Sequence, residues 1–444
     1  MLFTPLTLPN GSVIPNRLAK AAIEEEMAEP GQLPGPALRR LYECWGRGGA
    51  GLIITGNVMI DGRALAGAGD VVLEAATPLA PFSEWAKTTR QQGAQFWMQL
   101  NHPGRQVMAS LGGNAWAPSA VALDLGKHSK LFAQPVAMTA AEIAEVIARF
   151  AASSHAAELA GFDGVQIHAA HGYLISQFLS PLANQRTDEW GGSLANRARL
   201  LVEVLRAVRS RVSLGFSVAV KLNSADFQRG GFSEHDAKDV VLLLNELRVD
   251  LLELSGGSYE SPAMQGRTAD GRTLAREAYF LEFAKELAAI ARMPVMTTGG
   301  ISRKAVAERV LASGVAMAGM AAALVEVPDL PLQWRDGREP AALPQPVNWK
   351  DKTMASLASS AMVRRRIRAL AHGQMKPNRY SALFTLILDQ LRNRRTTKRY
   401  REWLRQVNAT PSTTRLVQPA EASSPAARAA YDAPRGRGVH ETKA

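Results

Sequence analysis

The residues best suited to chemistry lie within six positions of one another, in the segment HAAHGY. His168 and His171 are separated by two alanines, and Tyr173 follows after one glycine. The apolar run that ends at His168 begins at Gly164, and such a short run bounded by glycine is typical of a buried strand in a parallel sheet. In a parallel barrel, the carboxyl ends of the strands carry the active site. The segment is therefore a candidate active site.

This spacing does not favour a zinc site. Helical zinc motifs place two histidines four residues apart with a glutamate between them, whereas here the spacing is three and only alanines lie between. We therefore expect no metal ligand in this segment. Either histidine, taken alone, could equally be a structural residue at the end of a strand.

Length and composition limit the class of protein. The 444 residues, 46% of them hydrophobic, suffice for one large α/β barrel with an extension or for two to three ordinary domains. The single cysteine, Cys44, excludes a disulfide framework and a cysteine-ligated iron–sulfur cluster. We see no signal peptide, and no apolar run approaches the roughly 20 residues of a membrane helix. We therefore expect a cytoplasmic protein without a membrane span.

Strands and helices alternate along most of the chain. Apolar runs predict eight strands, at 17–23, 51–55, 94–100, 164–168, 216–222, 250–254, 295–298 and 315–319. The helices between and after them are expected at 34–47, 81–92, 139–159, 195–211, 233–247, 279–291, 303–313 and near 328–334. Thr139 and Glu142 form a capping box at one helix start, and Asn10 with Gly11 predicts the turn of an N-terminal hairpin. Eight βα units with continuous apolar strands predict a TIM (β/α)8 barrel.

The composition changes after the predicted barrel. We place the barrel at residues 1–340, a basic helical extension at 341–408 and a disordered tail at 409–444. Between Ala361 and Arg405, 13 Lys and Arg stand against 2 Asp and Glu, so most of the net charge of +12 belongs to the extension.

Two interpretations of the extension stay open. In the first, the charged helix faces are solvated and the LFTLIL stretch packs on the barrel or on a partner subunit. In the second, the cations bind an anionic membrane, a nucleic acid or an acidic redox partner. No nucleic-acid-binding motif is visible and aromatic residues are sparse. We therefore favour the first interpretation, expect a homo-oligomer and expect no nucleic-acid binding.

The segment HAAHGY, followed by SPLANQRTDEWGGS, resembles the signature of the old yellow enzyme family, the FMN-dependent NADH:flavin oxidoreductases. The resemblance spans roughly residues 3–331 and corresponds to a short form without an iron–sulfur domain. It implies FMN as cofactor and NADH or NADPH as reductant. It also implies that His168 and His171 hydrogen-bond the carbonyl oxygen of the substrate, while Tyr173 delivers a proton. His102 and Tyr259 are further expected substrate contacts.

The resemblance also implies how FMN is held. The segment NRLAKAAI is similar to the first-strand motif that packs against the flavin. Gln99 would hydrogen-bond the pyrimidine edge, and Lys221 would stabilise the negative charge of reduced flavin near N1 and O2. The loops after the seventh and eighth strands of a TIM barrel commonly bind phosphate. The other positions expected at the cofactor are Ala22, Ile23, Glu24, Gly56, Asn57, Gly299, Gly300, Gly319, Ala321 and Ala322.

Two departures from the family pattern bear on the cofactor. Ala321 and Ala322 occupy the positions of a phosphate-binding Gly-Arg pair, so a bidentate partner of the phosphate is missing. Arg303 or Lys304 could compensate. Glu24 stands where relatives usually carry Thr, Ser or Cys near the flavin O4. Its carboxylate could lower the flavin reduction potential, take up a proton through a raised pKa, or turn outward.

These observations together predict an FMN-dependent NAD(P)H oxidoreductase. The expected substrate is a small activated alkene such as an α,β-unsaturated carbonyl compound. Two alternatives stay open: a flavin-dependent oxidative dehydrogenase or demethylase of the same barrel family, and a barrel that has lost tight FMN binding and acts as a binding protein.

Overall fold

Eight parallel strands close into a barrel, which confirms the predicted (β/α)8 fold. The computed structural model describes residues 1–261, 263, 278–343, 345, 347–376 and 378–409. The barrel closes because β3 pairs with both β4 and β13. The strands are β3 (Leu18–Lys20), β4 (Leu52–Met59), β6 (Gln95–Asn101), β9 (Gly164–Ala169), β10 (Ser217–Asn223), β11 (Leu251–Ser255), β12 (Val295–Thr298) and β13 (Met317–Met320).

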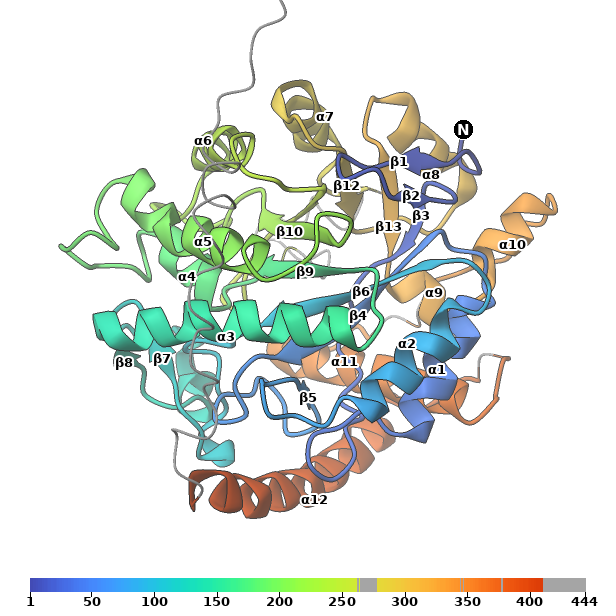
Figure 1. Ribbon diagram of the computed structural model, residues 1–444. Coiled ribbons are helices and arrows are strands. Elements are labelled where there is room, and N and C mark those ends of the chain that lie inside the picture. Colours follow the sequence, from blue (N-terminus) through green and yellow to red (C-terminus); the bar gives the residue numbers. More distant parts are fainter. Residues whose placement is uncertain (262, 264–277, 344, 346, 377, 410–444) are drawn as a thin grey trace, which may run out of the picture.

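Helices surround the strands on the outside of the barrel (Figure 1). They are α1 (Pro36–Gly46), α2 (Ala80–Arg90), α3 (Ala140–Leu159), α4 (Leu174–Leu179), α5 (Leu194–Arg209), α6 (Glu234–Leu244), α7 (Leu281–Ile290), α8 (Lys304–Ala312), α9 (Ala322–Glu326) and α10 (Leu330–Arg335). The capping box at α3 is confirmed, since the Thr139 hydroxyl accepts a hydrogen bond from the Glu142 N–H and the Glu142 carboxylate accepts one from the Thr139 N–H. The helix expected near 328–334 is confirmed as α10, whereas the short helices α4 and α9 were not predicted.

The barrel interior changes from apolar to polar toward the carboxyl ends of the strands. The apolar layer includes Leu52, Ile54, Trp97, Ala219, Leu251, Met296 and Met317. The hairpin of β1 (Leu6–Thr7) and β2 (Val13–Ile14) adds Leu6, Leu8 and Ile14 to this layer. Because side chains alternate along a strand, the next inward positions of β6, β10 and β11 are Gln99, Lys221 and Glu253. A polar floor therefore lies at the end of the barrel where the site is expected.

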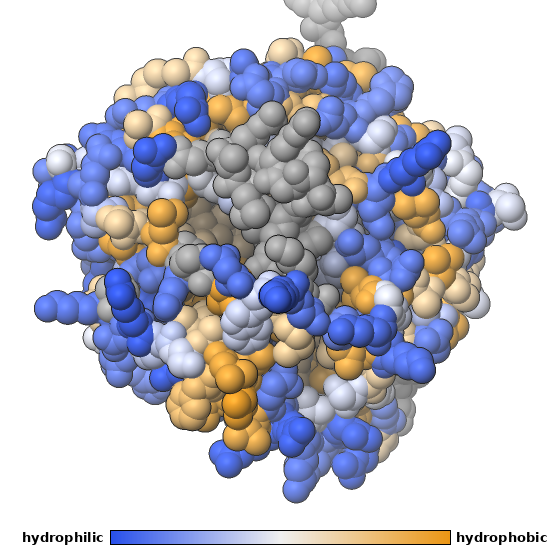
Figure 2. All heavy atoms as spheres, turned by 180° about the vertical axis from the view of Figure 1, so that it is seen from behind, coloured by the Kyte–Doolittle hydropathy of each residue, from blue (hydrophilic) through white to orange (hydrophobic). Residues whose placement is uncertain are grey.

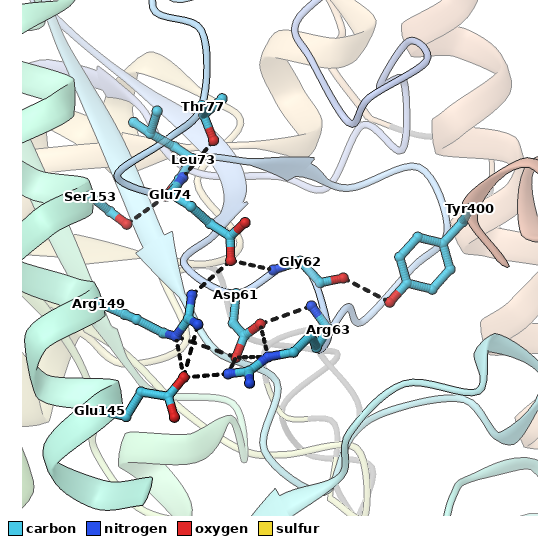
Figure 3. A network of polar contacts seen from close by, with 10 residues as sticks. All are labelled: Asp61, Gly62, Arg63, Leu73, Glu74, Thr77, Glu145, Arg149, Ser153 and Tyr400. Atoms are coloured by element: carbon cyan, nitrogen blue, oxygen red, sulfur yellow. Dashed lines mark hydrogen bonds and ion pairs between the residues drawn. The ribbon is translucent and has the colours of Figure 1, made fainter. Parts of the chain in front are cut away.

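Smaller elements complete the loops. The insertion between β6 and α3 contains η1 (Ala109–Leu111), β7 (Trp116–Ala117), η2 (Gly126–Leu131) and β8 (Val136–Ala137), and β5 (Val71–Val72) extends the sheet beside β4. The loop after β4 is held by ion pairs, shown in Figure 3: Arg149 of α3 bonds Glu74 and Glu145, and Arg63 bonds Asp61 and Glu145.

The C-terminal extension folds back on the barrel as α11 (Lys352–Ala371) and α12 (Ala382–Ala409), with α12 along the lower edge of Figure 1. The Tyr400 hydroxyl of α12 donates a hydrogen bond to the Gly62 carbonyl at 3.0 Å, which joins the extension to the loop after β4 (Figure 3). Of the described helices, none is long and apolar enough to cross a membrane. The tail expected to be disordered, 409–444, lies outside the described residues except for Ala409.

The LFTLIL stretch at the start of α12 does not pack on the barrel as a whole. Leu386 is buried, but Leu383, Phe384, Ile387 and Leu388 are between 42% and 60% exposed. The barrel therefore does not cover the outward face of this stretch, and its packing on a partner subunit stays a prediction.

Candidate active site

A tight turn after β9 brings His168, His171 and Tyr173 together. The His168 ring lies 5.0 Å from the His171 ring and 4.9 Å from the Tyr173 ring, between centroids, and both pairs meet edge to face. His171 has a positive φ of 61°, a conformation that most side chains avoid. Its backbone N–H donates to the Asn223 side chain at 3.1 Å, which holds the turn. The predicted trio thus forms one cluster at the carboxyl end of the barrel.

Both imidazoles are neutral near pH 7. Burial, followed by the neighbouring His171 and Lys221, keeps the pKa of His168 well below its usual value, and burial with Lys221 does the same for the pKa of His171. The Ala170 N–H donates to His168 Nδ1 at 3.2 Å, so the proton of this imidazole lies on Nε2. His171 Nε2 lies 2.8 Å from the Ser255 hydroxyl. The cluster therefore offers a neutral Nε2–H of His168 to a substrate oxygen, and Ser255 bonds the neighbouring His171.

The Tyr173 phenol contacts the carboxylate of Glu24, which lies four residues beyond β3. Asn57 Nδ2 donates to Glu24 Oε1 at 2.7 Å and to the Tyr173 hydroxyl at 3.3 Å, so one amide holds both groups. The Tyr259 hydroxyl is 3.1 Å from that of Tyr173. Burial and the adjacent Glu24 carboxylate hold the pKa of Tyr173 well above its usual value. Glu24 therefore turns into the site, and the phenol stays protonated.

The carboxylates next to Glu24 turn elsewhere. Glu25 accepts hydrogen bonds from the Tyr42 hydroxyl and from the Gly56 N–H, so it joins the barrel wall to α1. Glu26 pairs with Arg364 of α11 at 3.3 Å. Ala22 and Ile23, which precede Glu24, are half-buried.

A chain of polar side chains crosses the floor of the site. Gln99 Nε2 donates to Gln166 Oε1 at 2.7 Å, and Gln166 Nε2 donates to Glu253 Oε2 at 2.7 Å. Lys221 Nζ lies 2.9 Å from Glu253 Oε1, and both side chains are buried. The sequence analysis named Gln99 and Lys221 but missed Gln166 and Glu253. The available signal was a polar residue at an inward-facing position of the alternation, between apolar neighbours of the same strand.

The opposite side of the barrel mouth presents glycines and one buried hydroxyl. Gly299 and Gly300 follow β12, and both have positive φ. A Cβ at Gly319 would lie 2.1 Å from the Thr298 hydroxyl, so a larger residue would close this space. The Thr298 hydroxyl is buried and has no hydrogen-bond partner among the described residues. The arrangement leaves hydrogen-bonding capacity for a bound group.

The positions that depart from the family pattern lie beside these glycines. Ala321 is the N-cap of α9 and Ala322 its first residue, and both are half-buried without a charged group of their own. Arg303 is the N-cap of α8 and Lys304 its first residue, so both follow the Gly299–Gly300 turn. Their compensating role stays a prediction.

His102 lies to one side of the cluster. Its ring stacks on Trp116 at 6.2 Å between centroids, and its Nδ1 accepts a hydrogen bond from the Gly104 N–H at 3.1 Å. Its Nε2 is buried without a hydrogen-bond partner in the described part of the chain. Burial lowers the pKa of His102 to about 4, although the nearby Asp61 opposes this shift. Neighbouring Arg105 pairs with Glu260 at 2.7 Å. The substrate contact expected of His102 remains a prediction.

The residues around the barrel mouth fit FMN. Gln99 and Lys221 supply an amide and a cation at the floor, as a pyrimidine edge requires. The Asn57 Oδ1 and Thr298 Oγ1 atoms are buried and lack partners within the described residues, so each can bond a bound molecule. Gly299 and Gly300 offer backbone N–H groups to a phosphate. The pocket thus has donors for both ends of the cofactor.

Comparisons with known proteins agree with this chemistry. Residues 1–340 match the family model of the NADH:flavin oxidoreductase / NADH oxidase family. The "NADH-dependent flavin oxidoreductase iliE" of Hypocrea jecorina is 36% identical over 351 residues, covering 74% of this chain and 87% of that protein. The protein of the same name from Neonectria sp. is 38% identical over 355 residues, and the matched region is 74% of this chain but only 46% of that protein's length. Among solved structures, an old yellow enzyme homologue from Zymomonas mobilis superposes with a TM-score of 0.67 at 25% identity, over 78% of this chain and 93% of that one.

Proposed function

Because the chain belongs to the NADH:flavin oxidoreductase / NADH oxidase family, we propose that it reduces the activated C=C bonds of α,β-unsaturated carbonyl compounds. Family membership makes it an old yellow enzyme-like oxidoreductase that uses FMN and a nicotinamide cofactor. The observation that carries the proposal is the Tyr173 phenol beside the His168 ring, 4.9 Å between centroids. A hydrogen-bond donor for a carbonyl oxygen and an acid for the neighbouring carbon are thus side by side.

The roles of the side chains follow from their protonation. The N–H groups of His168 and His171 donate to the substrate carbonyl oxygen, where negative charge develops when the β-carbon is reduced. Both are neutral, so they stabilise this charge without transferring a full proton to it. The Tyr173 phenol is protonated and gives its proton to the α-carbon. FMN, held by Gln99 and Lys221 at the floor, supplies the hydride when it is bound.

Replacement of the phenol tests this assignment. Tyr173→Phe should slow flavin reoxidation by an enone at least about 100-fold, the usual range for loss of a general acid, while reduction by NADH stays close to the wild-type rate. Stopped-flow absorbance measures the two half-reactions separately. Tyr400→Phe removes a buried phenol outside the site and serves as the matched control. An equal loss in both half-reactions would refute the role of Tyr173.

The visible absorption spectrum separates this proposal from the binding-protein alternative. A flavin spectrum that NADH bleaches and an enone restores supports the reductase. If the protein does not take up FMN, the substitution of the Gly-Arg pair by Ala321 and Ala322 has abolished tight binding of the cofactor. Substrate-dependent bleaching without NADH would instead support the oxidative dehydrogenase.

A further inference from the structure

We propose that Glu24 supplies the proton that Tyr173 passes to the substrate. This inference rests on the proposed alkene reduction and extends it, since Tyr173 gives up one proton in each turnover and must regain it. Glu24 is the carboxyl group in direct contact with the phenol. Asn57 bonds both partners and holds them in that contact.

Solvent access points to the same direction of transfer. Tyr173 is only 3% exposed, whereas Glu24 is half-buried. The phenol is therefore poorly placed to take a proton from water, while Glu24 touches both the phenol and the solvent side of the pocket.

The charges facing Glu24 favour a stored proton. These groups are Tyr173, Tyr259, Glu26 and Asp70 on the barrel side and Arg364 on α11. Burial raises the pKa of Glu24 most, and Glu26 raises it further. The hydrogen bonds from Tyr173 and Asn57 and the charge of Arg364 act in the opposite direction without cancelling the rise. Glu24 therefore keeps its proton at a higher pH than an ordinary glutamic acid.

The proton balance closes within one turnover. The Tyr173 O–H bond breaks as the C–H bond at the α-carbon forms, and the Glu24 O–H bond then breaks as the phenol is restored. The Glu24 carboxylate regains a proton from water. The electron pair comes from the nicotinamide cofactor as hydride through FMN, so no further reductant is required.

Glu24→Gln tests the proposal, because the amide keeps the size of the side chain and its accepting oxygen but stores no proton. Reoxidation by an enone should slow at least tenfold, and the fall in rate with rising pH that the proposal predicts for the wild type should be absent from this variant. Glu26→Gln is the matched control: it removes an adjacent carboxylate that does not contact Tyr173, and it should keep the pH-dependent fall but move it to lower pH, because Glu26 raises the pKa of Glu24. A wild-type rate and pH profile in Glu24→Gln would overturn the proposal.

A second readout does not depend on turnover. In infrared spectra of the FMN-free protein taken over a pH series, the band of a protonated carboxylic acid should persist to higher pH than for an ordinary glutamic acid, and this band should be absent from Glu24→Gln. If the band is found but no alkene is reduced, the proposed function fails while the stored proton stands. A Glu24 that ionises at the pH of an ordinary glutamic acid, or below it, would overturn the inference itself.

The outward face of α12 carries a second inference independently of the active site. We infer that this face binds an anionic lipid surface. Its first turns expose Leu383, Phe384, Ile387, Leu388 and Leu391, between 42% and 60% each. The same face then exposes the cations Arg394, Arg395, Lys398, Arg401 and Arg405. Figure 2 shows hydrophobic side chains gathered toward the lower part of the molecule, where α12 lies in Figure 1.

The pattern on this helix favours lipid over nucleic acid. Burial of large apolar side chains at the boundary between lipid headgroups and acyl chains is favourable, whereas such side chains do not strengthen phosphate contacts along a nucleic acid. Cations on the same face meet the negative headgroups. The opposite face of α12 is occupied, since Thr385, Asp389 and Tyr400 are buried against the rest of the protein. The helix can therefore present its outward face without leaving the barrel.

Co-sedimentation of the full chain with vesicles tests the surface. Phosphatidylcholine vesicles containing phosphatidylglycerol should bind the protein, and pure phosphatidylcholine should bind it much less. Leu388→Glu should abolish binding, whereas Leu242→Glu, a 51% exposed leucine on α6, should leave it unchanged. Arg395→Gln combined with Lys398→Gln should weaken binding about 25-fold, since each cation near such a surface contributes about fivefold.

Two results would overturn the lipid assignment. The first is that anionic vesicles bind the wild type no better than neutral ones. The second is a concentration-dependent dimer in light scattering that Leu388→Glu abolishes, because a second copy of the chain would then cover the face.

Discussion

The buried pair of Lys221 and Glu253 gives the sharpest test of how the floor of the site is built. Their side chains are 4% and 0% exposed, and the ammonium lies 2.9 Å from the carboxylate. Lys221→Met removes the cation but keeps the length of the side chain. Among the described residues, the Glu253 carboxylate would then retain the hydrogen bond from Gln166 and the longer-range attraction of Lys20. Breaking a buried ion pair by removing one partner costs about 3–5 kcal/mol, so we expect a loss of that size in the free energy of unfolding.

The double variant separates the charge from the packing. Lys221→Met combined with Glu253→Gln replaces the pair by neutral groups of similar size, and the glutamine can still accept from Gln166. A buried pair replaced as a unit is often close to neutral in stability. We therefore expect the double variant to recover all but about 1–2 kcal/mol of the loss. Denaturant unfolding of the FMN-free wild type, both single variants and the double variant completes the thermodynamic cycle.

The same pair sets the charge beneath the cofactor. Glu253→Gln leaves Lys221 as an uncompensated cation, which should raise the reduction potential of bound FMN, while Lys221→Met should lower it. Equilibration with redox dyes measures both shifts. Two stability results would refute the reasoning about the pair. One is a fall of less than about 1 kcal/mol in the free energy of unfolding for Lys221→Met, and the other is a double variant that is no more stable than Lys221→Met.

Three further predictions concern the surroundings of the site. Arg364→Met should lower the free energy of unfolding by about 2 kcal/mol, which is less than for a fully broken buried pair because Arg368 still bonds Asp389. The same variant should shift the pH profile of reoxidation to higher pH, since Arg364 lowers the pKa of Glu24. An unchanged profile would contradict that coupling. His102 stays neutral in the folded protein down to pH about 4, whereas in the unfolded chain the imidazole takes up its proton near the usual pKa of 6.5. Stability should therefore fall by about 3 kcal/mol as the pH drops between these values, and calorimetry should find this loss absent from His102→Gln. Thr139→Ala should lower the free energy of unfolding by about 1 kcal/mol, because α3 loses its N-cap. An unchanged free energy in denaturant unfolding would show that the exposed capping box does not stabilise the fold.

The C-terminal extension contributes to the site although it lies beyond the residues that the family model matches. Arg364 of α11 pairs with Glu26, two residues from Glu24, and Arg399 of α12 donates to the Ala28 carbonyl. The segment that carries Glu24 is thus held between the barrel and the extension. Its position depends on residues more than 330 positions away.

The sequence by itself determined the barrel and the cluster of His168, His171 and Tyr173. Apolar strands, helix caps and glycine turns act through neighbouring residues, and the three catalytic candidates follow one another within a single turn. Local patterns of this kind are visible in a linear chain because the interactions that produce them span only a few positions.

Only the tertiary structure decided which distant groups meet. Glu24 contacts Tyr173 across 149 positions, and Lys221 meets Glu253 on the adjacent strand. These contacts depend on the register of parallel strands and on the path of each loop, neither of which leaves a local pattern in the sequence. The direction of the Glu24 side chain and the partner of Lys221 follow from barrel closure, since closure brings the ends of separate strands to one mouth.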